Sequence, residues 1–221
     1  MKLLKIELPA RDVHRTVRSC DDWHRLLWQG FGHGHESRRF LFRVNCGDGT
    51  VQILLRCPKD WSFFPKLLKC PVLAFGEKEI PDLFWNHPCH IFSLRAEPSI
   101  CRSVGDPQKR GRRCYLWREE ECRQWLENRS SDGIFRFLKK SIAVDRLADS
   151  CPMARRGVGS SKCLWWRRMT DFSGLLTVED GTKFKKLCAA GIGCEKNYGC
   201  GLLLLRPVSE KNMQNFGKES Q

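Results

Sequence analysis

A glycine-rich segment near the end of the chain constrains the fold more than any other feature. It reads Gly-Ile-Gly-Cys-Glu-Lys-Asn-Tyr-Gly-Cys-Gly from position 191 to 201, and the apolar run Leu202–Leu205 follows it. A helical pattern at 182–190 precedes it, so a helix, a tight glycine loop and a strand are expected in this order. Glycine accepts positive φ angles and lets other groups approach the main chain closely.

Two interpretations of this loop stay open at the level of spacing. Its N–H groups could bind a phosphate, with Gly191, Gly193, Gly199 and Gly201 allowing a close approach and Lys196 adding a positive charge. The glycines could equally end a helix and form a turn. No Lys-Ser or Lys-Thr closes the loop and no strand precedes it, so neither a Walker loop nor the dinucleotide fingerprint is indicated.

The charge balance of the chain favours a polyanionic partner. Its 221 residues include 39 Lys and Arg against 25 Asp and Glu, a formal net charge of +14. Such an excess favours nucleic acid through counterion release and steering. An acidic membrane is the second candidate, but no apolar run approaches the roughly 20 residues of a membrane span. Residues 1–9 alternate and carry charges, unlike a signal peptide, so we expect a cytoplasmic protein with no membrane partner.

The cysteines and histidines give little support for a metal site. The 13 cysteines contain no Cys-x-x-Cys pair, so most are expected to be buried small hydrophobes, and disulfides are not expected in a reducing compartment. His33 with His35, and His87 with Cys89 and His90, could each supply metal ligands, but no second ligand pair accompanies them. We therefore expect loop or edge-strand roles for these residues, and no cofactor.

Hydrophobic patterns predict an α+β chain made of two similar halves. In the first half a helix is expected at 19–31 and strands at 3–8, 39–45, 51–56 and 90–96. The proline-rich stretch 57–88 would have to supply a second helix, for which 59–69 is the candidate. The second half follows a basic linker, with helices expected at 119–128 and 182–190, a basic hairpin at 154–170, and strands at 134–144, 175–178 and 202–205.

Each half therefore suggests a split βαβ, ferredoxin-like unit. We assign residues 1–98 to an N-terminal domain that carries the candidate catalytic histidine. Residues 99–208 form a C-terminal domain with the basic hairpin and the glycine loop, and residues 209–221 form a polar tail.

His24 is the histidine best placed for acid–base chemistry. The helix expected at 19–31 buries a stripe of apolar side chains: Trp23, Leu26, Leu27 and Phe31. His24 falls at the edge of this stripe, next to solvent. Imidazole titrates near neutrality, and Asp21, three residues earlier, would favour the charged ring as a proton donor.

A structural interpretation of the same helix stays open. His24 could be a boundary residue whose ring packs against Trp28. Asp21 could be a first-turn charge, and Ser19 with Asp22 fits the spacing of a capping box.

Other hydrolytic mechanisms lack their motifs. There is no Gly-x-Ser-x-Gly elbow, and the acidic residues form no Asp-x-Asp or Asp-x-Glu pair in a strand context. If the chain cuts RNA, the available chemistry is attack by the 2′-hydroxyl on its own phosphate, helped by a proton acceptor, a proton donor and cations. DNA cannot supply that nucleophile.

Two basic segments could hold the RNA. The first runs from 102 to 118 and the second from 155 to 168, where Trp165 and Trp166 lie among the basic residues. Arginines of a hairpin can straddle the phosphates of an A-form stem, and indoles can stack on an unpaired base. The alternative is a solvated ribbon with the tryptophans facing the core. Besides the glycine loop, the residues assigned to RNA binding are Arg25, Arg110, Arg112, Arg113, Arg155, Arg156 and Lys162.

Four segments match the motifs of one known family. The most specific is the glycine loop with the Leu-Leu-Leu-Leu-Arg-Pro that follows it at 202–207, and the others are Phe92–Pro98, Trp23–Trp28 and Phe40–Val44. With these segments the chain resembles the CasE family of type I-E CRISPR systems, endoribonucleases of the RAMP superfamily that process precursor CRISPR RNA.

This resemblance implies tandem ferredoxin-like folds and metal-free cleavage at the base of a repeat hairpin, with a 2′,3′-cyclic phosphate product. It also implies that the hairpin of the CRISPR RNA stays bound within the Cascade complex, so the expected partners are CRISPR repeat RNA and other Cascade subunits. His24 takes the place of the family's catalytic histidine, and the hairpin at 155–168 would grip the stem.

One departure from the family pattern bears on activity. The tyrosine that often stands three residues before the family's histidine is Asp21 here. Either Asp21 orients or tunes His24, or a lysine or water takes the partner role, or the chain binds RNA without cutting it. We expect an active endoribonuclease, with a non-catalytic RNA-hairpin-binding subunit as the alternative.

Overall fold

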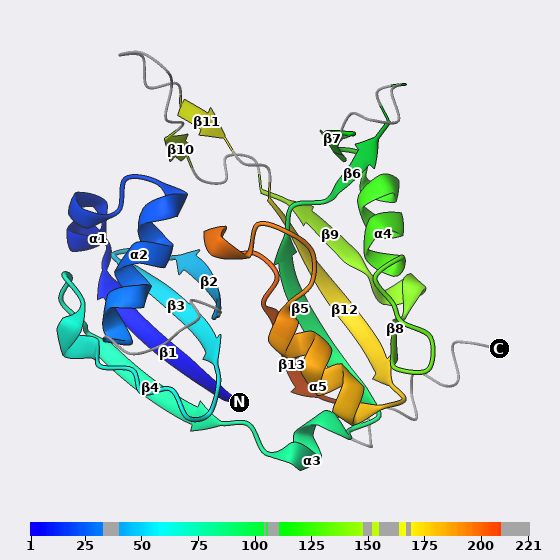
Figure 1. Cartoon of the computed structure of the whole chain (residues 1–221), viewed down its shortest axis with the longest axis horizontal. Coiled ribbons are helices and arrows are strands. Elements are labelled where there is room, and N and C mark those ends of the chain that lie inside the picture. The colour runs from blue at the N-terminus through cyan, green and yellow to red at the C-terminus, as the bar shows by residue number, and fades with distance from the viewer. Residues whose placement is uncertain are drawn as a thin grey trace.

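The structure is a computed structural model of the 221-residue chain. It describes residues 1–32, 40–103, 105, 111–147 and 169–208, together with the backbone of the two short strands 152–154 and 164–166. Figure 1 shows two antiparallel sheets side by side, each with its own helices, and two β-hairpins that project from the same side of the molecule.

The first sheet contains the strands β1 (Lys2–Pro9), β2 (Leu41–Cys46), β3 (Thr50–Cys57) and β4 (Ala74–Glu79) in the order β2-β3-β1-β4. The turn between β2 and β3 contains Asp48-Gly49, as expected for a hairpin, and Gly49 has a φ of +74°. The helices α1 (Ala10–Thr16) and α2 (Cys20–Gly30) lie over one face of this sheet.

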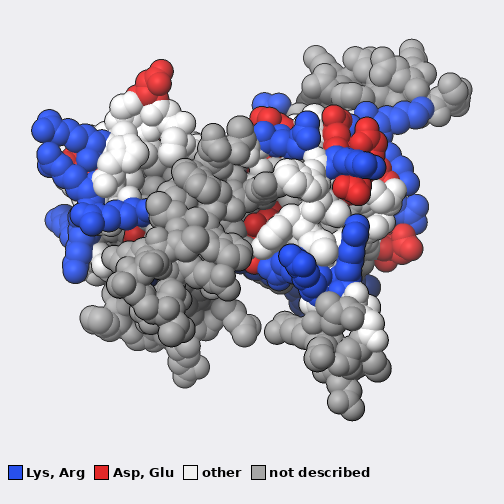
Figure 2. Space-filling model, turned by 90° about the horizontal axis from the view of Figure 1, so that it is seen from above, with Lys and Arg blue, Asp and Glu red and all other residues white. Residues whose placement is uncertain are grey.

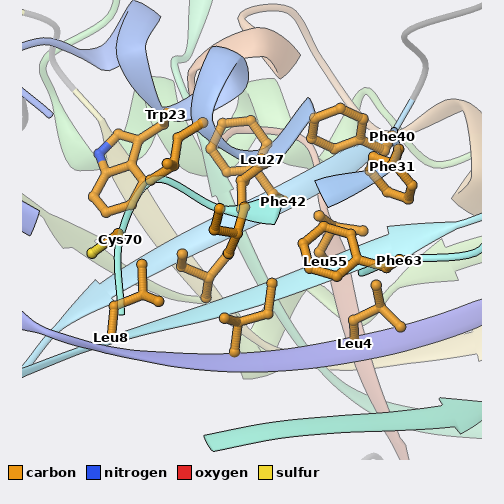
Figure 3. Close-up of a cluster of buried hydrophobic side chains, with 14 of the residues drawn as sticks. Leu4, Leu8, Trp23, Leu27, Phe31, Phe40, Phe42, Leu55, Phe63 and Cys70 are labelled. Carbon is orange, nitrogen blue, oxygen red and sulfur yellow. The ribbon is translucent and has the colours of Figure 1, made fainter. Parts of the chain in front are cut away.

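Alternation along β1 builds the core of this half. Leu4, Ile6 and Leu8 are fully buried, whereas Lys5 between them is exposed. They pack against the apolar stripe of α2, and Figure 3 shows the side chains of this cluster, including Trp23, Leu27 and Phe42, filling the space between helix and sheet.

The second sheet has the order β13-β5-β12-β8, with β9 pairing to the other half of β12. Its strands are β5 (Cys89–Ala96), β8 (Phe135–Phe137), β9 (Ala143–Arg146), β12 (Thr170–Val178) and β13 (Leu203–Pro207). The helices α4 (Glu119–Glu127) and α5 (Gly181–Ala190) pack their buried side chains onto one face of the sheet through Trp125, Phe184 and Cys188. The remaining strands form two hairpins, β6 (Ser99–Arg102) with β7 (Arg112–Tyr115) and β10 (Pro152–Ala154) with β11 (Leu164–Trp166).

When the strands of each sheet are numbered in chain order, with β8 and β9 counted as one, both sheets have the spatial order 4-1-3-2. This is the strand order of a ferredoxin-like unit. The expected α+β fold with tandem ferredoxin-like units is therefore confirmed. One helix is missing from the pattern, because 59–69 contains only the short 3-10 turn η1 (Pro65–Leu67) instead of the expected helix. Pro58, Pro65 and Pro71 limit helix formation in this stretch.

The sheet pairing corrects several sequence-based assignments. The strand expected at 90–96 forms as β5 but pairs with β12 and β13, so sheet membership changes before residue 89 rather than at 98. The expected linker after Pro98 is the hairpin β6–β7 over its described residues. The strand expected at 134–144 is divided into β8 and β9 by the 3-10 turn η2 (Lys139–Ser141). The short helices α1 and α3 (Asp82–Trp85) and the strand β4 were not expected.

Charged side chains join the two sheets on the faces that the helices leave uncovered. Arg43 of β2 and Arg95 of β5 both bind Asp171 of β12, with N–O distances of 2.8 to 2.9 Å. Arg43 also donates to Ser93 Oγ, and Arg95 donates to the carbonyl oxygen of Val44. These residues alternate with core residues, so each sheet contributes its second face to a polar junction between the two halves.

Arg56 makes a second junction, and it is buried. Its guanidinium donates to the carbonyl oxygens of Cys188 at 3.2 Å and Leu203 at 2.6 Å, which belong to α5 and β13. Burial lowers the pKa of Arg56, an effect that the neighbouring Cys188 partly opposes. A strand of the first sheet is thereby fixed to the helix and the last strand of the second.

Most described cysteines are buried, as expected, and burial raises the pKa of the Cys188 thiol to about 12. Cys20 is an exception to the expected absence of disulfides, because it is disulfide-bonded. Within the part of the chain that the structure describes, no helix is both long and apolar enough to cross a membrane.

Candidate functional site

The helix α2 presents His24 at the edge of its buried face, as its periodicity predicts. Trp23, Leu26 and Leu27 are buried, Arg25 is exposed, and His24 is partly buried between these extremes. The ring of His24 is therefore fixed by an ordered helix while part of it stays open to solvent.

His24 packs on aromatic rings of the first sheet. Its imidazole stacks on Phe40, with ring centroids 4.7 Å apart and an interplanar angle of 13°, and lies 6.4 Å from the ring of Phe42. Trp28, which the sequence suggested as the packing partner, instead lies parallel to Phe40 at 6.3 Å.

The first turn of α2 uses Asp22 rather than Asp21 for its hydrogen bonds. Asp22 accepts from the backbone N–H groups of Arg18 and Ser19 and from the Ser19 hydroxyl at 2.9 to 3.0 Å, which confirms the capping box. Burial tends to raise the pKa of Asp22, but the hydrogen bonds from Arg18 and Ser19 outweigh it, so the pKa is lowered. Arg25 forms an ion pair with the same carboxylate.

Asp21 is partly buried, and no hydrogen bond joins it to His24, both being described residues. The expectation that Asp21 acts on His24 through direct contact thus has no support in the geometry. Any influence of Asp21 on the imidazole acts through space.

The glycine loop folds back on itself and on β5. The N–H of Ile192 donates to Gly201 O at 3.0 Å, and the N–H of Gly201 donates to Arg95 O at 2.8 Å. Between them lies a 3-10 turn, η3 (Lys196–Tyr198), which packs against α2 and β2. Gly191, Gly193, Gly199 and Gly201 all have φ values between +76° and +85°.

The close approaches that require glycine in this loop are to the protein itself. A Cβ on Gly191 would lie 2.8 Å from the Leu41 side chain, and one on Gly199 would lie 3.3 Å from Phe42. A Cβ on Gly193 or Gly201 would likewise meet protein atoms, at 3.2 and 2.9 Å. This geometry favours the structural interpretation of the glycines, and a phosphate contact by the loop or by the partly buried Lys196 stays a prediction.

The two basic segments differ in what the structure describes. Arg112 and Arg113 are exposed on β7, and Arg113 forms an ion pair with Glu195 of the glycine loop. Arg110, Arg155, Arg156 and Lys162 lie outside the described residues. The strands of the second hairpin, β10 and β11, do pair as expected, and β10 lies against α2.

These contacts bring four separate segments to one place. The helix with His24 touches both η3 and β10, and the Arg113–Glu195 pair links the hairpin β6–β7 to the same loop. A cavity of about 730 Å³ lies beside α2, and its lining includes His14 of α1, Trp23 of α2, Arg95 of β5 and Tyr198 of η3 but not His24. Figure 2 looks down on the face from which the hairpins project and shows Lys and Arg side chains at both ends of it.

The histidines considered as metal ligands have other roles where they are described. His90 is fully buried, its Nε2 donates to the carbonyl oxygen of Phe84 at 3.1 Å, and burial lowers its pKa to about 4. His87 Nδ1 lies 2.7 Å from the carbonyl oxygen of Cys89. Over the described residues no group of three or more potential ligands is assembled, while His33 and His35 lie outside them.

Sequence reasoning missed some residues that contact His24 or line the cavity beside α2. Phe40 and Phe42 were noted only as part of a motif, although their spacing of two places them on one face of an extended segment. Arg18 and Tyr198, which line the cavity, carried no periodic signal because they lie in irregular connections.

The two ferredoxin-like sheets define a tandem ferredoxin-like α+β protein. Where the sheets join, the helix with His24, the glycine loop and two basic hairpins come together, an arrangement typical of a nucleic-acid-binding site. A family model described as CRISPR associated protein matches residues 1–207. The chain therefore belongs to this family, and the resemblance to its CasE members is confirmed.

Solved structures share the fold over nearly the whole chain. A CRISPR endoribonuclease Cse3 bound to a 19-nucleotide RNA aligns with a TM-score of 0.76 at 24% identity, covering 94% of this chain and 100% of that one. Cse3 of Thermus thermophilus, bound to an RNA representing a pre-cleavage complex, aligns at 0.67 and 25% identity over 93% and 98%. Cas6e of Escherichia coli K-12 aligns at 0.65 and 23% identity over 94% and 100%.

The same fold occurs in a chain of E. coli Cascade bound to double-stranded DNA, at 19% identity and a TM-score of 0.51 over 93% and 99% of the two chains. A search of curated proteins found no match.

Proposed function

We propose that this protein is an endoribonuclease that cleaves the hairpins of CRISPR repeats in precursor CRISPR RNA and stays bound to the product as a subunit of Cascade. The observation that carries this proposal is that α2, the helix with the partly buried His24, contacts both η3 of the glycine loop and β10 of the second basic hairpin. Family membership and the RNA-bound Cse3 structures of the same fold support it.

The proposed chemistry uses the RNA's own nucleophile. The 2′-hydroxyl gives its proton to a base, for which a lysine or water is available, as its oxygen attacks the adjacent phosphorus. The bond from phosphorus to the 5′-oxygen breaks, and a 2′,3′-cyclic phosphate remains on one product. His24 donates a proton to the leaving 5′-oxygen, a role that the stacked and partly exposed imidazole suits. Nearby cations stabilise the charge that develops on the phosphate oxygens.

In this proposal the two hairpins hold the RNA. Arg112 is an exposed cation on β7, next to the Arg113 that pairs with the glycine loop. The sequence at 155–168, which includes β11, is rich in basic residues, and β10 of the same hairpin contacts α2. Arginines so placed could straddle the phosphates of an A-form stem and bring the base of that stem to His24. The other Cascade subunits would then meet a protein that already carries its RNA.

The decisive experiment incubates repeat RNA with the protein in EDTA and analyses the ends of the products. We expect cleavage at one position with a 2′,3′-cyclic phosphate terminus, and no cleavage when a single 2′-deoxy substitution removes the nucleophile at that position. Cleavage of the deoxy substrate, or complete dependence on a divalent cation, would reject this mechanism.

A second candidate is a non-catalytic subunit that only binds the repeat hairpin. It is favoured by one observation: Asp21 stands where the family often has tyrosine and makes no hydrogen bond to His24 among the described contacts. This candidate predicts tight hairpin binding with intact RNA after long incubation, and a cyclic phosphate terminus would exclude it.

A further inference from the structure

An exposed apolar groove lies beside η1 and the start of β4, and His24 is not among the residues that line it. Four large apolar side chains between residues 64 and 75 are strongly exposed: Phe64 (53%), Leu67 (49%), Leu73 (58%) and Phe75 (39%). Beside them runs a groove of about 620 Å³ formed by η1, the following loop and the start of β4. We call this the β4 groove.

The β4 groove is held in place by buried anchors. Phe63, Leu68 and Cys70 alternate with its exposed residues and belong to the core of the first half. The Phe63 and Phe75 rings stack with centroids 5.8 Å apart. Backbone bonds fix both ends of the segment, from Phe64 N–H to Gly30 O at 2.7 Å and from Leu73 N–H to Glu7 O at 2.8 Å. The exposed side chains are therefore presented by an ordered backbone.

The groove borders an open sheet edge. β4 pairs only with β1, so its other side has no strand partner within the described structure. Its second half carries charges that form ion pairs, Lys2 with Glu77 and Lys59 with Glu79, and such charges commonly protect an edge. Its first half, Ala74–Gly76, carries no charge, and an extended segment of another protein can add to such an edge.

The charges around the groove indicate the chemistry of its occupant. Lys66 and Lys69 are exposed and make no ion pair with any described residue. Cations next to leucine and phenylalanine side chains complement a peptide in which carboxylates accompany apolar residues. The two leucines favour protein over nucleic acid, since bases stack on aromatic rather than aliphatic side chains.

We propose that the β4 groove binds an extended segment of a neighbouring protein subunit, in which apolar side chains alternate with acidic ones. This inference rests on the proposed function, because membership in a multi-subunit complex supplies the neighbour. The apolar side chains enter the groove, the carboxylates pair with Lys66 and Lys69, and the backbone lies along the start of β4. The site of RNA cleavage stays free, since the groove and His24 use different residues.

The test compares full-length variants in a complex reconstituted from this chain, its repeat RNA and the other Cascade subunits of the same organism. One variant combines Leu67→Glu with Leu73→Glu, and another combines Lys66→Glu with Lys69→Glu. Leu83→Glu is the matched control, because Leu83 is an exposed leucine of α3 (80%) outside the groove. Each variant is also tested alone for repeat-hairpin binding and for thermal unfolding.

We expect the leucine variant to enter the complex with about tenfold lower affinity, the loss typical of removing one well-packed interface side chain. The lysine variant should lose affinity mainly at low salt, because screening weakens exposed charge pairs. Leu83→Glu should assemble normally, and hairpin binding by the isolated chain should be unchanged in every variant.

Three results would overturn the proposal. Normal assembly of both groove variants would show that no subunit docks there. Loss of hairpin binding by the isolated variants would make the groove an RNA surface. Loss of a wild-type homodimer in the variants would make the occupant a second copy of the chain. A wild-type chain that binds no repeat hairpin would instead reject the proposed function, a readout independent of the groove.

Discussion

The imidazole of His24 is restrained on one side and accessible on the other. Stacking on Phe40, itself a buried residue, fixes the plane of the ring, while the edge position on α2 leaves part of it open. A general acid needs this combination, because its proton must point toward the leaving oxygen when the substrate binds. Among the described residues, packing on Phe40 orients the ring, and Asp21 makes no hydrogen bond to it.

The first prediction concerns this residue. His24→Ala should slow single-turnover cleavage of repeat RNA by about 10²- to 10⁴-fold, the usual contribution of general acid–base catalysis. Hairpin affinity should stay nearly unchanged, because the imidazole contributes one contact among many. Rapid-quench kinetics and filter binding measure the two quantities.

His87→Ala is the matched control for that experiment. His87 is a partly buried histidine between α3 and β5 that does not line the cavity beside α2, and its replacement should leave the cleavage rate unaltered. Equal rates for His24→Ala and the wild type would remove His24 from the chemistry.

For single residues, the sequence predicts which side chains are buried better than it predicts which side chains they contact. The 3.6-residue period alone places Trp23, Leu26 and Leu27 inside and His24 at their edge, as observed. The stacking partner could not be predicted, because no sequence periodicity relates Phe40, just before β2, to a residue of α2. Asp21 shows the same limit, since a spacing of three suggested a contact that the side chains do not make.

The glycine loop, an element of the second half, packs closely against the first half. Gly191 has a φ of +76° and would place a Cβ 2.8 Å from Leu41 of the first sheet. Gly191→Ala should therefore lower the free energy of unfolding by roughly 2–4 kcal/mol, through backbone strain and overpacking together. Chemical denaturation monitored by tryptophan fluorescence measures the change.

Gly49→Ala tests a positive φ without close packing, whereas Gly191 combines its positive φ with a ψ of 155°, a region that is essentially limited to glycine. Gly49 has nearly the same φ, +74°, but no atom lies within 4 Å of an added Cβ. Its replacement should cost only about 1 kcal/mol from backbone strain. If both variants lost the same free energy, the close packing of the loop on Leu41 would have no energetic role.

The hairpin β6–β7 contains two neighbouring arginines with different expected roles. Arg113 is paired with Glu195, whereas the exposed Arg112 makes no ion pair within the described part of the chain. Arg112→Ala should weaken binding of the RNA hairpin. It should also reduce the slope of the logarithm of the binding constant against the logarithm of the salt concentration by roughly one unit, as for one lost phosphate contact on DNA. Titrations at several salt concentrations measure this slope.

Arg136→Ala, which removes an exposed arginine of β8, serves as the control and should leave the slope unchanged. An unaltered slope for Arg112→Ala would place that residue outside the RNA interface.

The elements that sequence predicts are those with a clear period. Both long helices of the second half and the strands β1, β3 and β5 appear within a few residues of their expected positions. β4 was missed because all its residues are exposed and give no alternation, and α1 because it buries only Val13. η2 divides one expected strand because β12 passes very close there: a Cβ on Gly174 would lie 2.7 Å from Ser141 O.

At the scale of the whole molecule, the two halves depend on Asp171. Its carboxylate binds two guanidinium groups, and the three side chains are only 11 to 18% exposed. Asp171→Asn should lower the free energy of unfolding by roughly 3 kcal/mol or more, because it leaves two partly buried arginines without their counter-charge. Equilibrium denaturation with probes in both halves measures the loss.

Asp132→Asn is the control, because the Asp132 side chain is 94% exposed and its pairing with Arg136 contributes little. If Asp171→Asn were as stable as this control, the polar junction would not hold the sheets together.

The strand order of the second half has a consequence for synthesis on the ribosome. β5 must wait for β12 and for β13, the last strand of the described structure, before both its edges are paired. The turn η3, which packs against α2, lies just ahead of β13, so α2 leaves the exit tunnel long before this neighbour exists. A nascent chain halted before residue 196 would thus lack η3, and the proposed site is complete only when translation is nearly finished.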